Sequence, residues 1–176
     1  METTDSDKHW YVVLTRTNSE RKVRDYFQLQ EVDTFLPVQN RVIEREGKRI
    51  ERERLLLPRM VFVHISRQEM AAVRSTLNVY DFLRDRSTGA PTCIPDAQMA
   101  DFRYMLDYSQ DQVILTGESI PKGTRVVVAK GDLQGLRGEL VRYNNKYHIL
   151  VRIDMFGSAM VTIPASYVLS LIHISE

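Results

Sequence analysis

Apolar residues in the first part of the chain follow two different periods. Runs of β-forming residues at 9–15, 60–65 and 79–85 have the pattern of strands, and the segments between them repeat apolar residues every three or four positions. A period of two is typical of a strand, and a period near 3.6 is typical of an amphipathic helix. The pattern therefore predicts a sheet with helices packed on it, and MVFVHI at 60–65 is its expected central strand.

Three helices are predicted from capping signals and apolar spacing. The first begins at Asn18 or Ser19, either of which can cap it. The second begins at Ser66, because Glu69 stands three residues later, at the spacing of a capping box. The third follows Pro95, and its buried stripe is expected to contain Met99, Phe102, Met105 and Leu106.

A charged segment, RVIEREGKRIERER at 41–54, stands directly before the apolar segment LLLPRMVFVHI at 55–65. Glu46, Gly47 and Lys48 predict a tight reversal, so the charged segment is expected to be a solvated hairpin. Pairing of its basic residues with its glutamates across the two strands is expected to account for the mixed charge. In the apolar segment, the residues expected in the core are Leu55, Leu56, Val61 and Val63.

Helical spacing ends after the third helix. The segment SQDQVILTGESIPKG at 109–123 has the composition of a linker, and short strands separated by glycines follow it. Asn144 and Asn145 stand between two of these strands and predict a hairpin turn, since asparagine tolerates positive φ. About five short strands in so small a segment predict a small barrel, because closure removes exposed strand edges. The chain is therefore expected to have an α+β fold with a domain boundary near residue 120.

Composition narrows the class of protein only slightly. The 176 residues are 43% hydrophobic and 27% charged with a net charge of +1, so bulk charge gives no reason to expect nucleic acid or a membrane as partner. The single Cys93 excludes an internal disulfide and a cysteine-cluster zinc site. METTDSD at the start lacks the basic and apolar regions of a signal peptide, and no apolar run has membrane-spanning length. These features predict a cytoplasmic protein.

Three segments together carry a family resemblance: HWYVVLTRTNSERKV, LLLPRMVFVHI, and KGTRVVVAKGDLQGLRGELV with the later ILVRIDMFGSAMVTIP. In order and spacing they resemble a NusG-family transcription elongation factor. The resemblance implies an N-terminal NusG-like domain at 1–107, an antiparallel sheet with packed helices that binds RNA polymerase. It also implies a linker at 108–120 and a small SH3-like KOW β-barrel at 121–168.

Leu57, Pro58, Arg59 and Met60 stand where general NusG proteins typically have an aromatic residue followed by Pro-Gly-Tyr. This departure resembles the UpxY-type specialised paralogues, which are antiterminators of capsular polysaccharide operons. The resemblance therefore implies a bacterial transcription factor that suppresses pausing or termination without catalysis. A KOW-type RNA- or ribosome-binding protein is the alternative, because KOW barrels also occur in ribosomal proteins, although the full N-terminal domain argues against it.

The family uses a concave apolar surface to grip the tip of the clamp helices of RNA polymerase. Leu57, Pro58 and Met60 match the motif that makes this contact, and Trp10 and Tyr11 lie on the neighbouring strand. For Leu57 and Met60, a place in the core under the helices is the alternative. For Trp10 and Tyr11, a place in the core is an equal alternative. Family members also touch the gate loop of the polymerase through a helix; a solvent-facing helical turn is the alternative for the residues that match it here, Gln68, Glu69 and Met70.

Further matches concern nucleic acid and the second domain. Arg16, Lys22 and Arg74 match the polar surface with which specialised paralogues read non-template DNA, and a solvated basic face is the alternative. Phe156 matches the loop phenylalanine that family members offer to a small-subunit ribosomal protein or to the termination factor Rho, and a place inside the barrel is the alternative. The glycines of the KOW-like segment are expected to permit turns and close backbone approach: Gly131, Gly135 and Gly138.

No catalytic site, cofactor or metal is expected. The four histidines are scattered without metal-ligand spacing, and Cys93 has no base beside it in the sequence. The final LSLIHISE at 169–176 resembles the translation of a sequencing-library adapter, so this tail is suspected to be non-native. A last apolar strand within YVLSLI is the ordinary alternative.

Overall fold

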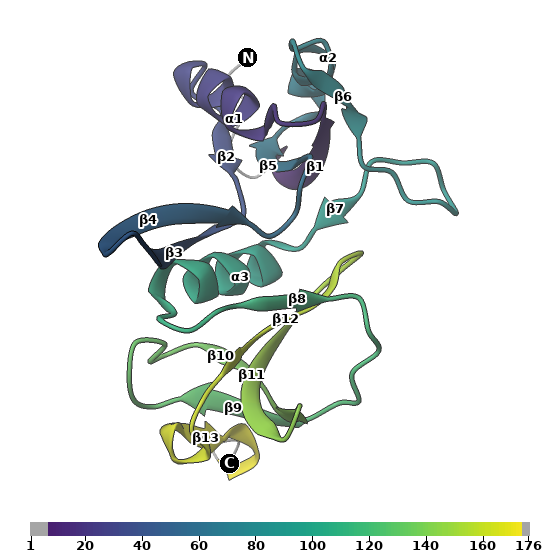
Figure 1. Cartoon of the computed structure of the whole chain (residues 1–176). Helices are drawn as coiled ribbons and strands as arrows, with labels where there is room; N and C mark the ends of the chain where they lie inside the picture. Colours follow the sequence, from purple (N-terminus) through teal and green to yellow (C-terminus); the bar gives the residue numbers. More distant parts are fainter. Residues whose placement is uncertain (1–6, 174–176) are drawn as a thin grey trace. The chain divides into compact units, whose positions relative to one another are not determined.

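In the computed structural model of this chain, β1 (His9–Thr15) and β5 (Met60–Ile65) are the inner strands of an antiparallel sheet (Figure 1). β2 (Asp33–Phe35) pairs with β5, while β6 (Val79–Phe82) and β7 (Cys93–Ile94) both pair with β1. The inner position of β5 confirms the expectation for MVFVHI. Strands this rich in β-branched and aromatic residues are typical of the middle of a sheet, where both faces are covered.

Contacts within the chain divide it into two units, Met1–Asp96 and Ala97–Glu176, and the structure describes residues 7–173. The division falls in the first turn of α3 (Asp96–Tyr108), so nearly all of this helix belongs to the second unit. The functional domain limits expected from the sequence remain a prediction, because contacts do not show which segments act together.

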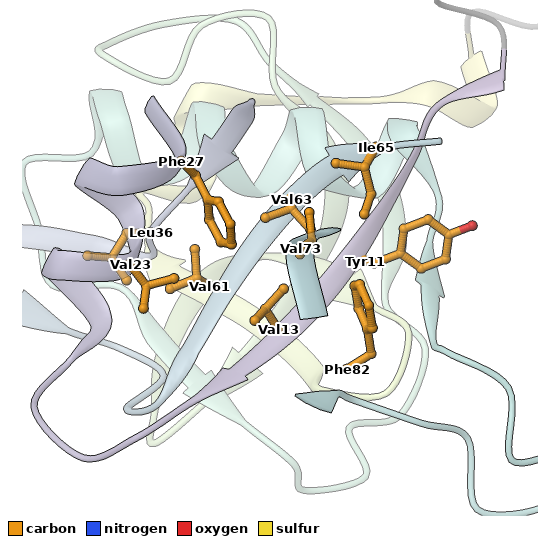
Figure 2. Packing of buried hydrophobic residues seen from close by; sticks show 10 residues of the cluster. All are labelled: Tyr11, Val13, Val23, Phe27, Leu36, Val61, Val63, Ile65, Val73 and Phe82. Atoms are coloured by element: carbon orange, nitrogen blue, oxygen red, sulfur yellow. The ribbon is translucent and has the colours of Figure 1, made fainter. Parts of the chain in front are cut away.

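The core of the first unit lies between the sheet, α1 (Glu20–Leu29) and α2 (Met70–Arg74). Alternate residues of β1 and β5 face this side of the sheet, as the period of two requires. Both Val61 and Val63 are fully buried here, which confirms their expected place in the core. Figure 2 shows the ten side chains of this cluster, which converge from both helices, the strands and the segment after β2: Tyr11, Val13, Val23, Phe27, Leu36, Val61, Val63, Ile65, Val73 and Phe82.

The starts of α1 and of the helical segment after β5 lie where the sequence predicts them, but the predicted cap bond is absent at α1 and present at the second. Ser19 occupies the N-cap of α1, yet its hydroxyl donates to the Thr17 carbonyl oxygen at 3.3 Å and does not cap the helix. A 3-10 turn, Arg67–Glu69, precedes the short helix α2. The Glu69 carboxylate accepts the Ser66 N–H at 3.4 Å, which is the return bond of a capping box.

β3 (Val38–Arg45) and β4 (Lys48–Leu55) form a two-stranded antiparallel sheet of their own. Glu46 and Gly47 make the turn between them, with φ angles of 54° and 74°. Positive φ at both central residues is the geometry of the two-residue loop that best matches the twist of a hairpin. The predicted hairpin is therefore confirmed.

The register of this hairpin corrects the explanation that the sequence suggested for its charge. Arg41 lies directly opposite Arg52, and Arg45 lies opposite Lys48. Opposite charges were expected to face each other, but the two-residue turn fixes a register that brings basic residues together at both of these positions. The expectation of general cross-strand charge pairing was therefore wrong.

The second unit contains a six-stranded antiparallel sheet in the order β13-β9-β10-β11-β12-β8. β8 lies inside the expected linker and pairs with β12, which shows that this segment is not wholly without secondary structure. Within residues 7–173, no pairing joins the two end strands β8 and β13 to each other. The bounds of the strands are β8 Ile114–Thr116, β9 Thr124–Val128, β10 Arg137–Tyr143, β11 Lys146–Ile153, β12 Gly157–Thr162 and β13 Val168–Ser170.

Two features of the second unit follow the sequence closely. The turn between β10 and β11 is made by Asn144 and Asn145, with φ angles of 51° and 64°, as predicted. A Cβ on Gly138 would lie 2.6 Å from the Leu150 carbonyl oxygen, so this position in β10 requires the close backbone approach that only glycine permits. The buried stripe of α3 is also confirmed, with Met99, Phe102, Met105 and Leu106 all buried.

The end of the chain forms β13 against β9, with Leu169 opposite Val127, and a 3-10 turn at Leu171–His173. This agrees with the strand that YVLSLI was able to form. The suspected non-native origin of 169–176 stays a prediction, and its last three residues, 174–176, lie outside the described residues.

Candidate functional site

The segment between β4 and β5 is a tight turn that carries the apolar residues singled out by the sequence. Arg59 has a φ of 65°, so the chain reverses through a left-handed conformation just before β5. The Leu56 N–H donates to the Pro37 carbonyl oxygen at 3.0 Å, and the Thr15 N–H donates to the Arg59 carbonyl oxygen at 2.9 Å. Backbone hydrogen bonds therefore fix this turn to β1 and to the start of β3.

Glu20 in the first turn of α1 completes the attachment. This residue is only 4% exposed, and its Oε1 accepts the Arg59 N–H at 2.9 Å. The carboxylate thereby satisfies a backbone donor in a strained turn, where an unpaired donor would be costly. Sequence reasoning missed this role, because an acidic residue at the start of a helix is already explained by the helix dipole.

The anchored turn presents apolar surface. Leu57 and Met60 are half-buried, and Pro58 is exposed. Met60 lies opposite Leu14 in the register of β1 and β5, on the face of the sheet that is turned away from the α1 core. We refer to Leu57, Pro58 and Met60 as the apolar turn.

The residues before the apolar turn are less buried than those after it. Leu55 is half-buried and packs against the core of the first unit, as expected. Leu56 is also half-buried. Of the four residues expected in the core, Val61 and Val63 are fully buried, whereas Leu55 and Leu56 are only half-buried.

Trp10 and Tyr11 lie beneath the surface, on opposite faces of the sheet. Trp10 is 6% exposed and stacks on His64 with ring centroids 5.0 Å apart. Tyr11 is 7% exposed and meets Phe82 edge to face in the core. Burial raises the pKa of the Tyr11 hydroxyl, and the nearby Cys93 raises it further, against the lowering effect of Arg67. In this conformation both aromatic rings are packed inside the protein.

In the turn that follows β5, one of the matched residues is exposed and the other two make contacts within the protein. Gln68 is exposed and available to a partner. The Glu69 carboxylate is occupied by the Ser66 N–H, and Met70 is half-buried against the core cluster. Of the three residues matched to the gate-loop contact, Gln68 is the one whose side chain faces solvent most fully.

Residues 8–103 match the family model described as "Transcription termination factor nusG", which spans more than half of the 176 residues. The chain belongs to the NusG family. Membership makes it a NusG-like transcription factor, and proteins of this family are not enzymes. None of the curated proteins compared with this chain matches it.

Solved structures give a likeness in fold to this NusG-family chain. The structure described as "Domain interaction in Thermotoga maritima NusG" has a TM-score of 0.51 at 19% identity, and the match covers 96% of this chain and 99% of that chain. Conformations A and B of the "MjSpt4:Spt5 complex" match at 14% identity, covering 92% of this chain and 96% of those chains, with TM-scores of 0.31 and 0.32. The Thermotoga structure shows the fold, and the two other likenesses add nothing to it.

The residue between Pro58 and Met60 has an unusual backbone conformation. Arg59 has a left-handed φ of 65°. This conformation costs an L-residue with a Cβ on the order of 1–2 kcal/mol. The hydrogen bond from the Thr15 N–H to the Arg59 carbonyl oxygen and the one from the Arg59 N–H to Glu20 hold the backbone in this conformation.

The basic residues matched to DNA reading are all exposed, and their surroundings differ. The Arg16 N–H donates to the Asn78 carbonyl oxygen at 2.9 Å, which ties the loop after β1 to the start of β6. Lys22 projects from the first turns of α1. Arg74 pairs with Asp81 at 3.4 Å between Nε and Oδ1, so its charge is partly compensated.

Asp81 collects several cationic and hydrogen-bonding partners. Desolvation alone would raise its pKa, but the hydrogen bond from Arg84, the Phe82 N–H and the charges of Arg84 and Arg74 together lower it. Asp81 is therefore ionised at neutral pH and competes with any phosphate for Arg74. Among the three matched basic residues, this ion pair makes Arg74 the least available to DNA.

Phe156 lies in the turn between β11 and β12 and is half-buried. Its N–H donates to the Ile153 carbonyl oxygen at 3.1 Å, and the preceding Met155 is 51% exposed with a φ of 73°. Gln98 on α3 accepts the Asp154 N–H at 2.8 Å and donates to the Asp154 carboxylate at 3.1 Å. The loop that carries Phe156 is thus held by α3 within the second unit.

Few side chains in the described part of the chain have the properties of a nucleophile or of a metal ligand. Burial raises the pKa of the Cys93 thiol, and the Asp96 carboxylate raises it further, so the thiol stays protonated at neutral pH. Residues 7–173 contain no group of three or more His, Cys, Asp or Glu that could hold a metal ion. None of the helices described is long and apolar enough to cross a bilayer.

Proposed function

We propose that this NusG-family protein is an antitermination factor that binds RNA polymerase through the apolar turn. The observation that carries the proposal is the geometry of that turn: Leu57 and Met60 are held half-exposed by Glu20 and by backbone hydrogen bonds. A rigid apolar surface suits recognition of a protruding helical tip, because little order is lost on binding. The clamp helices are the expected partner.

The apolar turn supplies one part of the binding free energy. Full burial of an exposed leucine or methionine side chain contributes roughly 1.5–3 kcal/mol. Leu57 and Met60 are already half-buried, so each gains only a part of this on binding. Trp10 and Tyr11 are buried, so we assign them to the support of this surface from within the sheet. Met60 replaces the family tyrosine, and its flexible thioether adapts to an uneven partner surface.

A second contact with the polymerase gate loop would make the factor a bridge across the cleft. Gln68, Glu69 and Met70 are the matched residues, and we expect Gln68 to contribute most because its side chain is exposed. A factor that binds the closed clamp better than the paused one shifts the equilibrium by its differential affinity, and about 1.4 kcal/mol gives a tenfold change. Pausing and termination would then fall without any catalysis by the factor.

The remaining assignments follow the same family model. Arg16, Lys22 and Arg74 would contact exposed non-template DNA, and Phe156 would contact a small-subunit ribosomal protein or Rho from a closed KOW barrel. We infer a cytoplasmic, specialised UpxY-type factor that acts at particular operons such as capsular polysaccharide loci. The Leu57-Pro58-Arg59-Met60 sequence, in place of the general family motif, supports this specialisation.

The experiment is a pull-down of core RNA polymerase by the purified full-length chain and by Leu57→Asp with Met60→Asp. Two buried carboxylates in the interface should reduce retained polymerase to background, because unpaired charges are costly to desolvate. The matched control is Leu29→Asp with Leu77→Asp, which places two charges on side chains that are 81% and 83% exposed. Circular dichroism and a melting curve establish that each variant is folded.

Polymerase binding that is unchanged in the folded Leu57 and Met60 variant would refute the surface assignment. Equal loss in the control variant would show that added negative charge, rather than the apolar turn, is responsible. Ribosomal subunits are tested in parallel. Capture of these subunits without polymerase would favour the alternative function, a KOW-type RNA- or ribosome-binding protein.

A further inference from the structure

The β3–β4 hairpin has two chemically different faces. Because side chains of paired residues point to the same side of a two-stranded sheet, the register assigns each residue to a face. One face carries the pairs Gln39–Arg54, Arg41–Arg52, Ile43–Ile50 and Arg45–Lys48. The first of these pairs lies at the root of the hairpin, where Gln39 is buried and Arg54 is half-buried. We call Arg41, Arg45, Lys48 and Arg52, with the two isoleucines between them, the basic face.

The opposite face has the opposite balance of charge. It carries the pairs Asn40–Glu53, Val42–Glu51 and Glu44–Arg49, which include three carboxylates and one cation. Its root, Val38 and Leu55, packs against the core of the first unit. Glu53 also pairs with Arg21 of α1, with 3.1 Å between Oε2 and Nε. The basic face is therefore turned away from the α1 core.

The charges on the basic face destabilise the hairpin. Like charges directly opposite each other across two strands are destabilising, and the face has two such pairs with no carboxylate among them. All four cationic residues are exposed. Among the described residues, none of these four side chains forms an ion pair within the protein. The face therefore presents positive charge that is not compensated within the hairpin and that an anionic partner would neutralise.

We propose that the basic face of the β3–β4 hairpin binds the phosphate backbone of double-stranded DNA. Arg41 and Arg45 are four residues apart on β3, and Lys48 and Arg52 are four apart on β4, so the cations form two pairs separated along the strands by about 13 Å. Within each pair the two strands bring the residues to about 5 Å, which places two positive charges close together for an anionic phosphate. Three of the four cations are arginines, whose planar guanidinium binds phosphate through two donors.

The shape of the element favours DNA over RNA. The major groove of B-DNA admits a two-stranded β-ribbon, whereas the major groove of an A-form RNA helix is too narrow and deep for side chains. Apart from Ile43 and Ile50, the basic face offers no exposed apolar or aromatic side chain on which unstacked bases of a single strand would stack. This surface is distinct from Arg16, Lys22 and Arg74, and its proposal does not depend on polymerase binding.

The test measures binding of the full-length chain to a fluorescently labelled DNA duplex of mixed sequence over a series of salt concentrations. The variant combines Arg41→Gln, Arg45→Gln, Lys48→Gln and Arg52→Gln. We expect its dissociation constant to rise at least about tenfold near 0.1 M salt. The slope of log affinity against log salt should become shallower by about 3–4, since each phosphate contact contributes about 0.9.

A matched control removes the same net charge elsewhere. It combines Arg49→Gln on the opposite face with Lys122→Gln, Arg137→Gln and Lys146→Gln, all of which are exposed. Unchanged duplex binding in the basic-face variant would overturn the proposal, and so would an equal loss in the control. Tighter binding of single-stranded DNA or duplex RNA than of the DNA duplex would overturn the choice of partner, as would binding of an acidic protein without any binding of DNA.

Stability supplies a second readout that separates binding from folding. Removal of the two like-charged pairs should leave the basic-face variant at least as stable as the wild type in a melting curve. Weak DNA binding by a variant of undiminished stability supports the proposal. A large loss of stability would show that these residues hold the fold, and the surface assignment would then be rejected.

Discussion

The chain contains two hairpins that begin from the same local chemistry and reach different outcomes. β3–β4 turns at Glu46 and Gly47, and β10–β11 turns at Asn144 and Asn145. All four of these residues have positive φ, between 51° and 74°. Turn geometry therefore sets the register in both hairpins, but it does not determine what the hairpin contributes to the protein.

The difference lies in what covers the strands. β10 and β11 have neighbours β9 and β12 and contain fully buried residues such as Ile149 and Leu150. β3 and β4 pair only with each other, and most of their residues beyond the root are exposed. A hairpin without packed neighbours is only marginally stable, so its side chains contribute less to folding and are freer to serve recognition.

The largest expected effect comes from truncating matched aliphatic residues in the two hairpins. Leu150→Ala should cost about 2–5 kcal/mol, because Leu150 is fully buried and its truncation leaves a cavity. Ile50→Ala should cost less than about 1 kcal/mol, since Ile50 is half-exposed and meets mainly Ile43 across the strands. Urea unfolding followed by circular dichroism measures both.

Similar losses for the two substitutions would contradict the comparison, because they would show that the β3–β4 hairpin is as strongly coupled to a core as β10–β11. Hydrogen exchange of the strand amides locates each effect. We expect faster exchange through the second unit in Leu150→Ala and only within the hairpin in Ile50→Ala.

The next largest effect concerns the ion pair that each hairpin makes. Arg152 on β11 binds Glu139 on β10 through two bonds of 2.7 and 3.1 Å, and Glu139 is 7% exposed. Arg21 binds Glu53 on β4, and both side chains are more than 40% exposed. Arg152→Ala should cost about 1–3 kcal/mol after allowance for partial screening, and Arg21→Ala less than about 1 kcal/mol.

The Glu139 pair also predicts a dependence on pH. The hydrogen bond from Arg152 lowers the pKa of Glu139, against desolvation, and the Gly123 N–H and nearby arginine charges lower it further. A lowered pKa in the folded state gives stability that is present above the ordinary carboxyl pKa and is lost as pH falls through the folded pKa. The difference in stability between wild type and Arg152→Ala should therefore shrink as pH falls below the ordinary carboxyl pKa and through the lowered pKa of Glu139. A difference that stays constant would show that Glu139 is not the partner that matters.

The sequence predicted elements better than it predicted tertiary partners. The buried stripe of α3, the asparagine turn and the inner strand β5 all follow from period and turn chemistry, which are local properties. The attachment of Arg59 to Glu20 could not be predicted, because it joins residues 39 apart through a carboxylate that has a sufficient local explanation. The apolar turn was found from family resemblance, since periodicity alone does not separate a half-exposed leucine from a buried one.

The two-faced charge of the β3–β4 hairpin was missed for a different reason. RVIEREGKRIERER contains six basic and four acidic residues, and composition cannot show which residues lie opposite each other. The positions of the turn residues decide the register, and a shift of one residue would exchange the faces. The sequence indicated a reversal at Glu46, Gly47 and Lys48 but not its length. The faces follow only once the turn is known to contain two residues, Glu46 and Gly47, so that Arg45 pairs with Lys48.

The smallest expected effect is a change in hairpin stability whose sign tests the register of β3 and β4. Arg41→Gln removes the repulsion of Arg52 and should stabilise the hairpin by about 0.2–1 kcal/mol, whereas Arg49→Gln removes the attraction of Glu44 and should destabilise it by a similar amount. Both substitutions remove one positive charge, so net charge cannot explain opposite signs. Hydrogen exchange of the β3 and β4 amides at low salt measures the two effects, and higher salt should reduce both. Effects of the same sign would mean that the faces are not segregated in solution, and the basic face would lose the physical basis of its proposed partner.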